Sequence, residues 1–417
     1  MRDTFRNLYF LSLFLILLPT MYLIPFVPST HSLAVLIWGF LFIYLIVKKN
    51  ALSELVNKNR SLLTVFMIFF IAQSLSVITA TDYQSFVSAY EKVISIGIFL
   101  FLSLYFIASK NELELFIKLL FTVTGINLLT ELFIFLSPNL FLTLVQRFYN
   151  KDYLDLVNIN IQRYRIYIEA YDEILIPLIL YYWIRNENKK IMLPFAVGIA
   201  VFSFLSLIRT KVVMFVLSVI ASTLIFFKEI KRVVIFIFLT LGVFTLMYLF
   251  LFNFDPYTVV DRFLLTYGTD QATISSRIER WQISFEMALS SPFFGVGLGN
   301  YYDYLPSNLQ QSVSSDSLAK QEFNIAALDP HDIFSSVIAE TGGVGITAFL
   351  IMLGYFVKED AGTMFKKKNM FSGVFIISFW TLFVYALFNP STSISYQSLF
   401  WVLRAVIYKL PLLGKHL

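Results

Sequence analysis

The sequence predicts an all-α, polytopic integral membrane protein with a single membrane domain over residues 1–417. The first observation is composition: the chain is 58% hydrophobic and only 14% charged, which leaves too little polar surface for a soluble globule. The second is that apolar runs close to the roughly 20 residues needed to span a bilayer recur along it. The third is that basic residues gather in alternate breaks between these runs.

About twelve transmembrane helices are expected. The sixth and the last apolar run are short for a full span, which leaves tilted or re-entrant helices open there. The first run lacks a small-residue cleavage site and is followed by further spans, so we expect it to be retained. The runs cover residues 8–27, 32–47, 61–79, 93–108, 115–136, 172–184, 191–208, 212–227, 233–253, 332–357, 370–388 and 399–413.

The orientation follows from the lysines and arginines, because short cytoplasmic connections retain them. If both termini are cytoplasmic, every strongly basic break falls on the cytoplasmic side, which favours an even number of helices. These breaks contain Arg2 and Arg6; Lys48, Lys49, Lys58 and Arg60; Arg185, Lys189 and Lys190; Lys228, Lys231 and Arg232; and Lys358 with Lys366 to Lys368.

Two outward segments are long enough to carry a function. The smaller covers residues 137–171 and contains Arg163 and Arg165; the larger covers residues 254–331, between the ninth and tenth predicted helices. We expect short helices in the larger loop. Ser276 and Glu279 have the spacing of a capping box, which predicts that a helix begins there.

An apolar stripe at helical spacing follows in this loop, and it includes Ile278, Trp281 and Phe285. Arg277 and Arg280 lie on the neighbouring polar stripe. One interpretation is an interfacial helix whose arginines face lipid phosphates. The other is that an arginine of this stripe holds a substrate phosphate. Spacing alone leaves both open.

Glycines alternate at Gly295, Gly297 and Gly299. A nucleotide phosphate loop is excluded, because no strand precedes them and no Lys-Ser or Lys-Thr follows. We expect a tight turn against the membrane helices. The chain has no cysteine, and its other potential ligands form no coherent cluster, so neither a metal nor a cofactor is expected. A net charge of +5 gives no nucleic-acid footprint.

Together these motifs resemble the O-antigen ligase and O-antigen polymerase superfamily of bacterial membrane glycosyltransferases. The resemblance is carried by Ser276-Arg277 with Trp281, by Pro292 to Tyr301 with its glycines, by His331-Asp332, by Glu340 with Gly342 and Gly345, and by Ser206 to Thr210. Two departures are present: Asp332 follows the histidine where the family usually has Asn, and two residues separate Ser206 from Arg209.

The resemblance implies transfer of a glycan from an undecaprenyl-diphosphate carrier to an acceptor sugar hydroxyl, at the periplasmic face of the bacterial inner membrane, without a metal. Its partners would be the lipid-linked donor, a glycan or lipid A core acceptor, membrane lipids and a polysaccharide chain-length regulator. Arg209 and Arg277 would stabilise the diphosphate leaving group, with His331 as the base. Substrate-binding candidates are Arg163, Arg165, Arg280, Trp281 and Glu340.

Local sequence supports a base at His331. If Asp329 caps the helix and Pro330 takes its first position, His331 lies in the first turn, where the helix dipole favours the neutral imidazole. Glu340 would lie about 13 Å further along the helix at 1.5 Å per residue. A carboxylate at that depth needs a partner, for which we expect an arginine from the Arg209 region.

Other functions stay open at this stage. Within the superfamily, composition weakly favours a polymerase over a ligase, and transfer of glycan to protein is a third branch. A lipid-linked glycan flippase also suits a dozen helices, although candidate residues gathered at one face favour chemistry over alternating access. A non-catalytic assembly scaffold is the remaining alternative.

Overall fold

The computed structural model describes residues 2–18, 30–48, 50–137, 139–141, 143, 171–205, 209–251, 269–304, 330, 332–366, 370–389 and 393–413. Regular structure in this part of the chain is entirely helical, with no strand. The all-α prediction is therefore confirmed for the residues that the structure describes.

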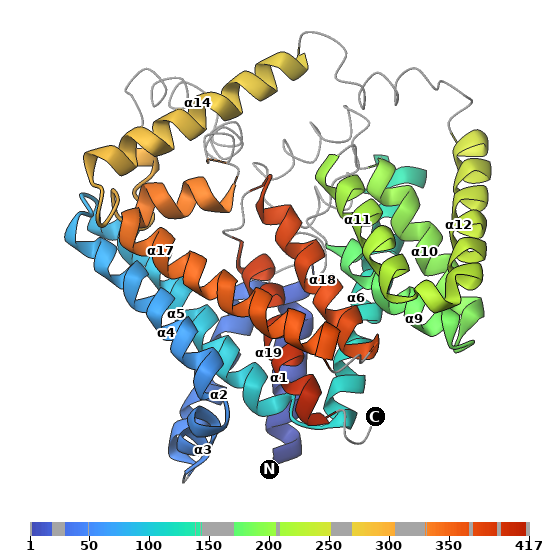
Figure 1. Ribbon diagram of the computed structural model, residues 1–417, viewed down its shortest axis with the longest axis horizontal. Coiled ribbons are helices and arrows are strands. Elements are labelled where there is room, and N and C mark those ends of the chain that lie inside the picture. The colour runs from blue at the N-terminus through green and yellow to red at the C-terminus, as the bar shows by residue number, and fades with distance from the viewer. Residues whose placement is uncertain are drawn as a thin grey trace.

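The N-terminal half contains long apolar helices with short connections (Figure 1). They are α1 (Arg2–Leu17), α2 (Thr30–Val47), α3 (Ala51–Lys58), α4 (Arg60–Leu75) with the 3-10 turn η1 (Ser76–Ile78), α5 (Tyr83–Phe106) and α6 (Lys110–Leu136). Side chains cap two of them: the Asp82 carboxylate accepts the amide of Gln84, and the Ser109 hydroxyl accepts the amide of Glu112. These bonds satisfy amides that have no partner within the first turn.

The C-terminal half continues with shorter helices and one long helix that is bent. Its elements are η2 (Asp172–Leu175), α9 (Ile176–Ile184), α10 (Lys189–Leu205), α11 (Arg209–Ile225), η3 (Phe227–Glu229), α12 (Ile230–Leu251), α14 (Thr269–Ser290), η4 (Tyr302–Tyr304), α17 (Ile333–Ala361), the π-turn η5 (Gly362–Lys366), α18 (Met370–Ala386) and α19 (Ile394–Leu413).

Three groups of helices are visible in Figure 1. Helix α17 packs along α4, and α19 packs between α5 and α18 in the middle of the molecule. Helices α9 to α12 lie together on the right, where α9 and α11 pack against α18. Helix α14 lies across the upper end, against α17. The N-terminal end of α1 and the C-terminal end of α19 both lie at the lower end, an arrangement that an even number of spans requires.

Within the described residues, each predicted span overlaps helical structure. By length and composition, however, four helical stretches among the described residues could cross a bilayer unaided, or six if each of two bent pairs counts as one span. One of these pairs is α11 and α12, between which the helix direction turns by 91°. A membrane protein of several helical spans is supported, and the number twelve stays a prediction.

A buried ion pair joins α17 to α19 within the aromatic core. The Arg404 guanidinium donates to both oxygens of Asp360, at 2.7 and 2.9 Å, and Trp380 donates its indole N–H to the same carboxylate at 2.9 Å. The guanidinium also lies 4.2 Å from the centre of the Phe356 ring. Charges this deep are tolerated because they are paired with each other and the carboxylate accepts a further hydrogen bond from Trp380.

Two local predictions are wrong. Helix α14 begins at Thr269 and not at Ser276, because the preceding Asp-Gln-Ala stretch favours a helix and contains no breaker. Ser276 and Glu279 are therefore interior helical positions and not a capping box. The segment after α2, expected as a plain connection, contains the short helix α3, which has an apolar side with a buried leucine at position 55.

Candidate functional site

Helix α17 is interrupted at Gly342, whose φ of 61° and ψ of −159° are not helical. In a regular helix the amides of Gly343 and Val344 would bond to the carbonyls of Ala339 and Glu340. The interruption frees all four groups. Two half-helices result, and their facing ends meet within the sequence that carries Glu340.

The glycine-containing loop after α14 takes up all four freed groups. Val296 and Gly297 donate their amides to the carbonyls of Ala339 and Glu340, at 2.9 and 3.0 Å. In return, the amides of Gly343 and Val344 donate to the carbonyls of Pro292 and Phe293, at 2.8 and 3.0 Å. The loop is thus joined to the broken helix by main-chain bonds in both directions, and every group exposed by the break is satisfied.

Glycine is required at both sides of this junction. A Cβ atom on Gly342 would lie 2.5 Å from the amide nitrogen of Gly295, and one on Gly295 would lie 2.5 Å from the carbonyl oxygen of Ala339. Gly295 also has a φ of +68°, which L side chains rarely adopt. The predicted tight turn against a membrane helix is therefore confirmed. At Gly342 the close contact is with this loop and not with another helix.

Asn300 fastens the far end of the loop to the connection before α5. It is fully buried, and its amide oxygen accepts the amides of Thr81 and Asp82 at 3.1 and 2.7 Å. Its amide nitrogen donates to the carbonyls of Asp82 and Leu298, both at 3.1 Å. Sequence analysis missed this role, because a lone asparagine in a polar loop gives no signal of burial.

Two carboxyl groups close to this connection lie outside the predicted spans. Hydrogen bonds from the Ser85 hydroxyl and the Gln84 amide lower the pKa of Asp82. Partial burial, assisted by the negative charge of Asp82, raises the pKa of Asp303. The surroundings therefore shift the pKa values of the two carboxyl groups in opposite directions, and they favour the carboxylate form of Asp82.

A cavity of about 430 Å³ adjoins the junction between α4, α5, α17 and α19. Most of its wall is apolar or aromatic, and the polar side chains include a lysine and a glutamate. The apolar wall includes Phe66, Phe69, Phe349, Phe400 and Trp401, whereas the polar lining consists of Gln73, Lys92, Ser336, Glu340, Thr341, Tyr396 and Gln397. An amphiphilic cavity of this kind suits a ligand with a lipid part and a polar part.

Glu340 is the predicted site residue that lies on this wall, where it is half-buried. Among the described residues that line the cavity, the cation is Lys92 from α5. An arginine from the Arg209 region as the partner of Glu340 stays a prediction. Lys92 was not predicted as a site residue. Its position could have indicated one, because it lies in a break predicted to face outward, where basic residues are scarce.

The other predicted residues are spread over several elements. Arg209 begins α11 and Arg280 lies on α14, both half-buried, and the main-chain carbonyl of Arg280 accepts the Ser284 hydroxyl at 2.8 Å. Trp281 lies on the outer apolar side of α14 and is 46% exposed. Arg277 is an interior position of the same helix, but its side chain falls outside the description.

Three predicted residues, Arg163, Arg165 and His331, lie outside the described residues. The cap beside His331 can nevertheless be corrected. Asp332, not Asp329, caps α17, because its carboxylate accepts the amide of Ser335 at 2.8 Å. Helix α17 starts at Ile333, so the argument that placed His331 within the first helical turn is wrong.

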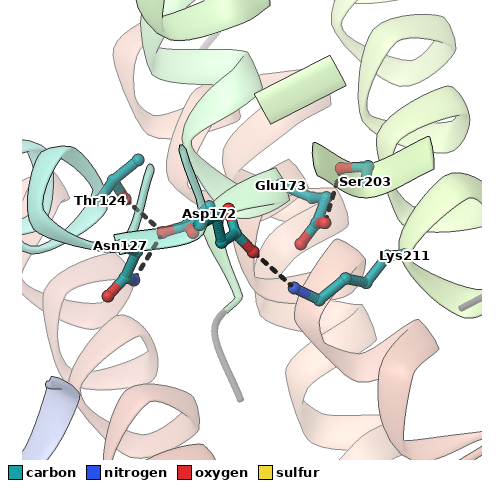
Figure 2. A network of polar contacts seen from close by, with 7 residues as sticks. Thr124, Asn127, Asp172, Glu173, Ser203 and Lys211 are labelled. Atoms are coloured by element: carbon teal, nitrogen blue, oxygen red, sulfur yellow. Dashed lines mark hydrogen bonds and ion pairs between the residues drawn. The ribbon is translucent and has the colours of Figure 1, made fainter. Parts of the chain in front are cut away.

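A buried polar network fixes the part of the structure that carries Arg209 (Figure 2). Asp172 of η2 accepts the hydroxyl of Thr124 at 2.6 Å and the amide nitrogen of Asn127 at 3.0 Å, both from α6. Its neighbour Glu173 accepts the hydroxyl of Ser203 of α10 at 2.7 Å. These bonds join three elements within an otherwise apolar interior.

Lys211, two residues after Arg209, supplies the cation of this network. Its ammonium nitrogen lies 3.9 Å from a carboxylate oxygen of Glu131, and both side chains are at most 4% exposed. Next to it, the Thr210 hydroxyl accepts the amide of Asn389 at 2.8 Å. The first turn of α11 is therefore held on two sides, which fixes the backbone of Arg209.

Among the described residues, no group of three or more His, Cys, Asp or Glu side chains has an arrangement that could hold a metal ion. What the described part offers chemically is a partly charged, amphiphilic cavity beside a rigid loop. The predicted arginines of the described part come from two separate helices: Arg209 from α11, and Arg277 and Arg280 from α14.

The O-antigen ligase family model matches residues 194–350. The match runs from α10 through the interruption of α17, and it includes Arg209, Arg277, Arg280 and Glu340. The resemblance to the O-antigen ligase and polymerase superfamily is thereby confirmed. No curated protein matches the chain.

Proposed function

Because residues 194–350 match the O-antigen ligase family, we propose that the protein is a membrane glycosyltransferase that transfers a glycan from undecaprenyl diphosphate to the hydroxyl of an acceptor sugar. The family supports activity of the ligase and polymerase type in general. We assign the polymerase reaction, in which the acceptor is a second lipid-linked glycan. This choice rests on composition: the chain is rich in Phe, Ile, Tyr, Asn and Lys, with 46 Phe and 23 Tyr residues, as expected for proteins encoded in AT-rich polysaccharide gene clusters.

The observation that carries the proposal is the cavity beside the glycine loop. The loop and most of the α17 side of the cavity lie in the part of the chain that the family model matches, whereas the sides formed by α4, α5 and α19 lie outside it. A lipid-linked diphosphate sugar needs an apolar wall for its prenyl chain and polar groups for its head. The aromatic wall and the Lys92 and Glu340 side chains provide both kinds of surface in one place. Expulsion of water from such a site strengthens each charged contact.

In the proposed reaction, the acceptor oxygen attacks the anomeric carbon of the donor, and the bond from that carbon to the diphosphate oxygen breaks. His331 takes the proton of the acceptor hydroxyl. The electron pair of the broken bond stays on undecaprenyl diphosphate, and the guanidinium groups of Arg209 and Arg277 stabilise the negative charge. Arg280, Trp281, Arg163, Arg165 and Glu340 are proposed to bind substrate. No metal is required.

A transporter is the second candidate, because interrupted membrane helices are typical of transporter binding sites. In those sites the freed main-chain groups contact the substrate or the coupling ion. Here the four groups freed at Gly342 bond to the loop after α14. The interruption therefore serves to attach the loop, which favours the enzyme over the transporter.

The test uses purified protein in nanodiscs with a synthetic undecaprenyl-diphosphate glycan, and it follows donor binding and product length separately. His331→Ala should retain donor binding but lose turnover by about 10²–10⁴-fold, the usual contribution of a general base. Arg277→Ala should weaken donor binding as well. Arg277→Lys should rescue poorly, because a point charge does not replace the planar fork. Chelator should change neither result.

Controls for the same assay come from the product. Long carrier-linked chains made from the donor alone would identify a polymerase, whereas transfer only to added lipid A core would identify a ligase. Normal turnover of the His331→Ala protein would remove the histidine from its proposed role. For the protein reconstituted into closed vesicles, movement of the donor across the membrane without any transfer would favour the flippase.

A further inference from the structure

A second cavity, of about 400 Å³, lies at the opposite end of the molecule from α14. It is formed by α3, the end of α2, the end of α5 and the C-terminal part of α19, at the lower end of Figure 1. The basic residues of the sequence predict that this end faces the cytoplasm. Its charged and polar lining consists of Lys48, Glu54, Lys58, Asn59, Tyr105 and Lys409.

Lys409 is the unusual member of this lining. Its side chain, on α19, is only 8% exposed, and within the described part of the chain its ammonium group has neither a hydrogen bond nor an ion pair. The Lys58 ammonium is close enough to repel it. Because Lys409 lines the cavity, an anion bound there would give its ammonium group an acceptor.

Two other lysines, Lys48 and Lys58, add positive charge to the lining of this cavity. The Lys48 ammonium donates to the Tyr105 hydroxyl at 2.6 Å. Lys58 lies 3.7 Å from Glu54, and both side chains are more than half exposed, so this pair is weak. Three lysines and one glutamate line the cavity, and they leave it with an excess of positive charge.

We propose that this cavity binds a phosphate group, supplied by an anionic phospholipid of the adjacent leaflet or by a soluble phosphate compound. Ammonium groups from three separate segments of the chain can surround a tetrahedral anion, and Lys409 gains an acceptor that the described part of the chain does not give it. Basic pockets between helices on the cytoplasmic side are suited to anionic headgroups. The site is separate from the cavity at Glu340 and does not depend on the proposed reaction.

The test compares three forms of the full-length protein in phosphatidylcholine nanodiscs: the wild type, Lys409→Met and Lys190→Met. Lys190 is an exposed lysine in another break predicted to be cytoplasmic, and it does not line the cavity. One arm titrates phosphatidylglycerol and counts bound lipid by native mass spectrometry. The other arm titrates inorganic phosphate against chloride at equal ionic strength and follows thermal unfolding.

We expect Lys409→Met to weaken binding by about tenfold or more, as for loss of a charge-assisted hydrogen bond. The Lys190→Met protein should bind within about twofold of the wild type. Loss in the lipid arm identifies a headgroup site, and loss in the phosphate arm identifies a soluble ligand.

Equal binding by Lys409→Met and wild type in both arms would overturn the proposal. Should Lys409→Met fail to fold, Lys58→Gln takes its place, because that side chain is 71% exposed and its change is tolerated. It should weaken binding several-fold in the same arm, and unchanged binding would again refute the site.

Discussion

Gly342→Ala is the most direct test of the junction between α17 and the glycine loop. The backbone at this position, with φ 61° and ψ −159°, is essentially restricted to glycine, and another residue would be strained by about 1–3 kcal/mol. The new Cβ would also lie 2.5 Å from the Gly295 amide nitrogen and 2.7 Å from the Phe293 carbonyl oxygen. Both contacts are with main chain, so the loop has to move away.

The cost follows from the bonds that the loop makes. The four main-chain hydrogen bonds across the junction contribute about 0.5–1.5 kcal/mol each, so separation of the loop adds about 2–6 kcal/mol. With the backbone strain, Gly342→Ala should lower the free energy of unfolding by about 3–9 kcal/mol. Transfer activity should fall with it, because the loop forms part of the cavity wall.

The matched control is Gly354→Ala, in the second half of the same helix. Nothing lies within 4 Å of a Cβ built there, and alanine is the better helix former by about 1 kcal/mol. Thermal unfolding of the detergent-purified proteins, followed by tryptophan fluorescence, should show opposite shifts for the two substitutions. Equal unfolding temperatures for Gly342→Ala and Gly354→Ala would refute the junction as described.

Two further outcomes are expected. In a protease-accessibility assay, a tag inserted after Lys190 should lie on the cytoplasmic side, and a tag inserted within 312–317 should lie on the outer side. A cytoplasmic tag within 312–317 would reverse the predicted orientation, and the proposed outer site would then be wrong. Asn300→Ala removes the hydrogen bonds that the buried Asn300 side chain makes with Thr81, Asp82 and Leu298, and it should lower the free energy of unfolding by about 2–5 kcal/mol. Asn57→Ala, on the exposed surface of α3, should have almost no effect in the same thermal unfolding assay. Equal effects of the two substitutions would argue against Asn300 as the anchor.

Apolar runs located the helices well, because each helix long enough to cross a membrane needs an unbroken apolar stretch. Caps and starts were harder. At α17 the sequence led us to expect Asp329 as the cap, but the cap is Asp332, because its carboxylate accepts the Ser335 amide. At α14 a correct capping pattern occurs inside a helix that had already begun at Thr269.

The glycines of the loop were predicted to form a turn, but what the turn contacts could not be predicted. An interruption at Gly342 has no signature of its own, because Gly-Gly in an apolar helix also suits close packing. The break and the loop specify each other through main-chain bonds, which carry no side-chain pattern. The pairing of Gly295 with Gly342 is visible only when both segments are placed in space.

The buried network was missed for a different reason. Asp172 and Glu173 begin a short predicted span, where charged residues look like the end of a polar loop. Glu131 lies near the end of another span. Only the fold brings these carboxyls to Ser203 and Lys211 across four elements. Intramembrane ionisable residues with partners far apart in sequence are recognised individually, but their partners are not.

Lys211→Met tests what this network does for the position of Arg209. Lys211 and Glu131 are buried 3.9 Å apart, and removing one partner of a buried pair costs about 3–5 kcal/mol, because a charge is left without compensation. The double variant Glu131→Gln with Lys211→Met removes both charges and should recover part of that loss. Lys190→Met, an exposed change, should have almost no effect. If Lys211→Met unfolds at the wild-type temperature, the pair is not what holds the first turn of α11.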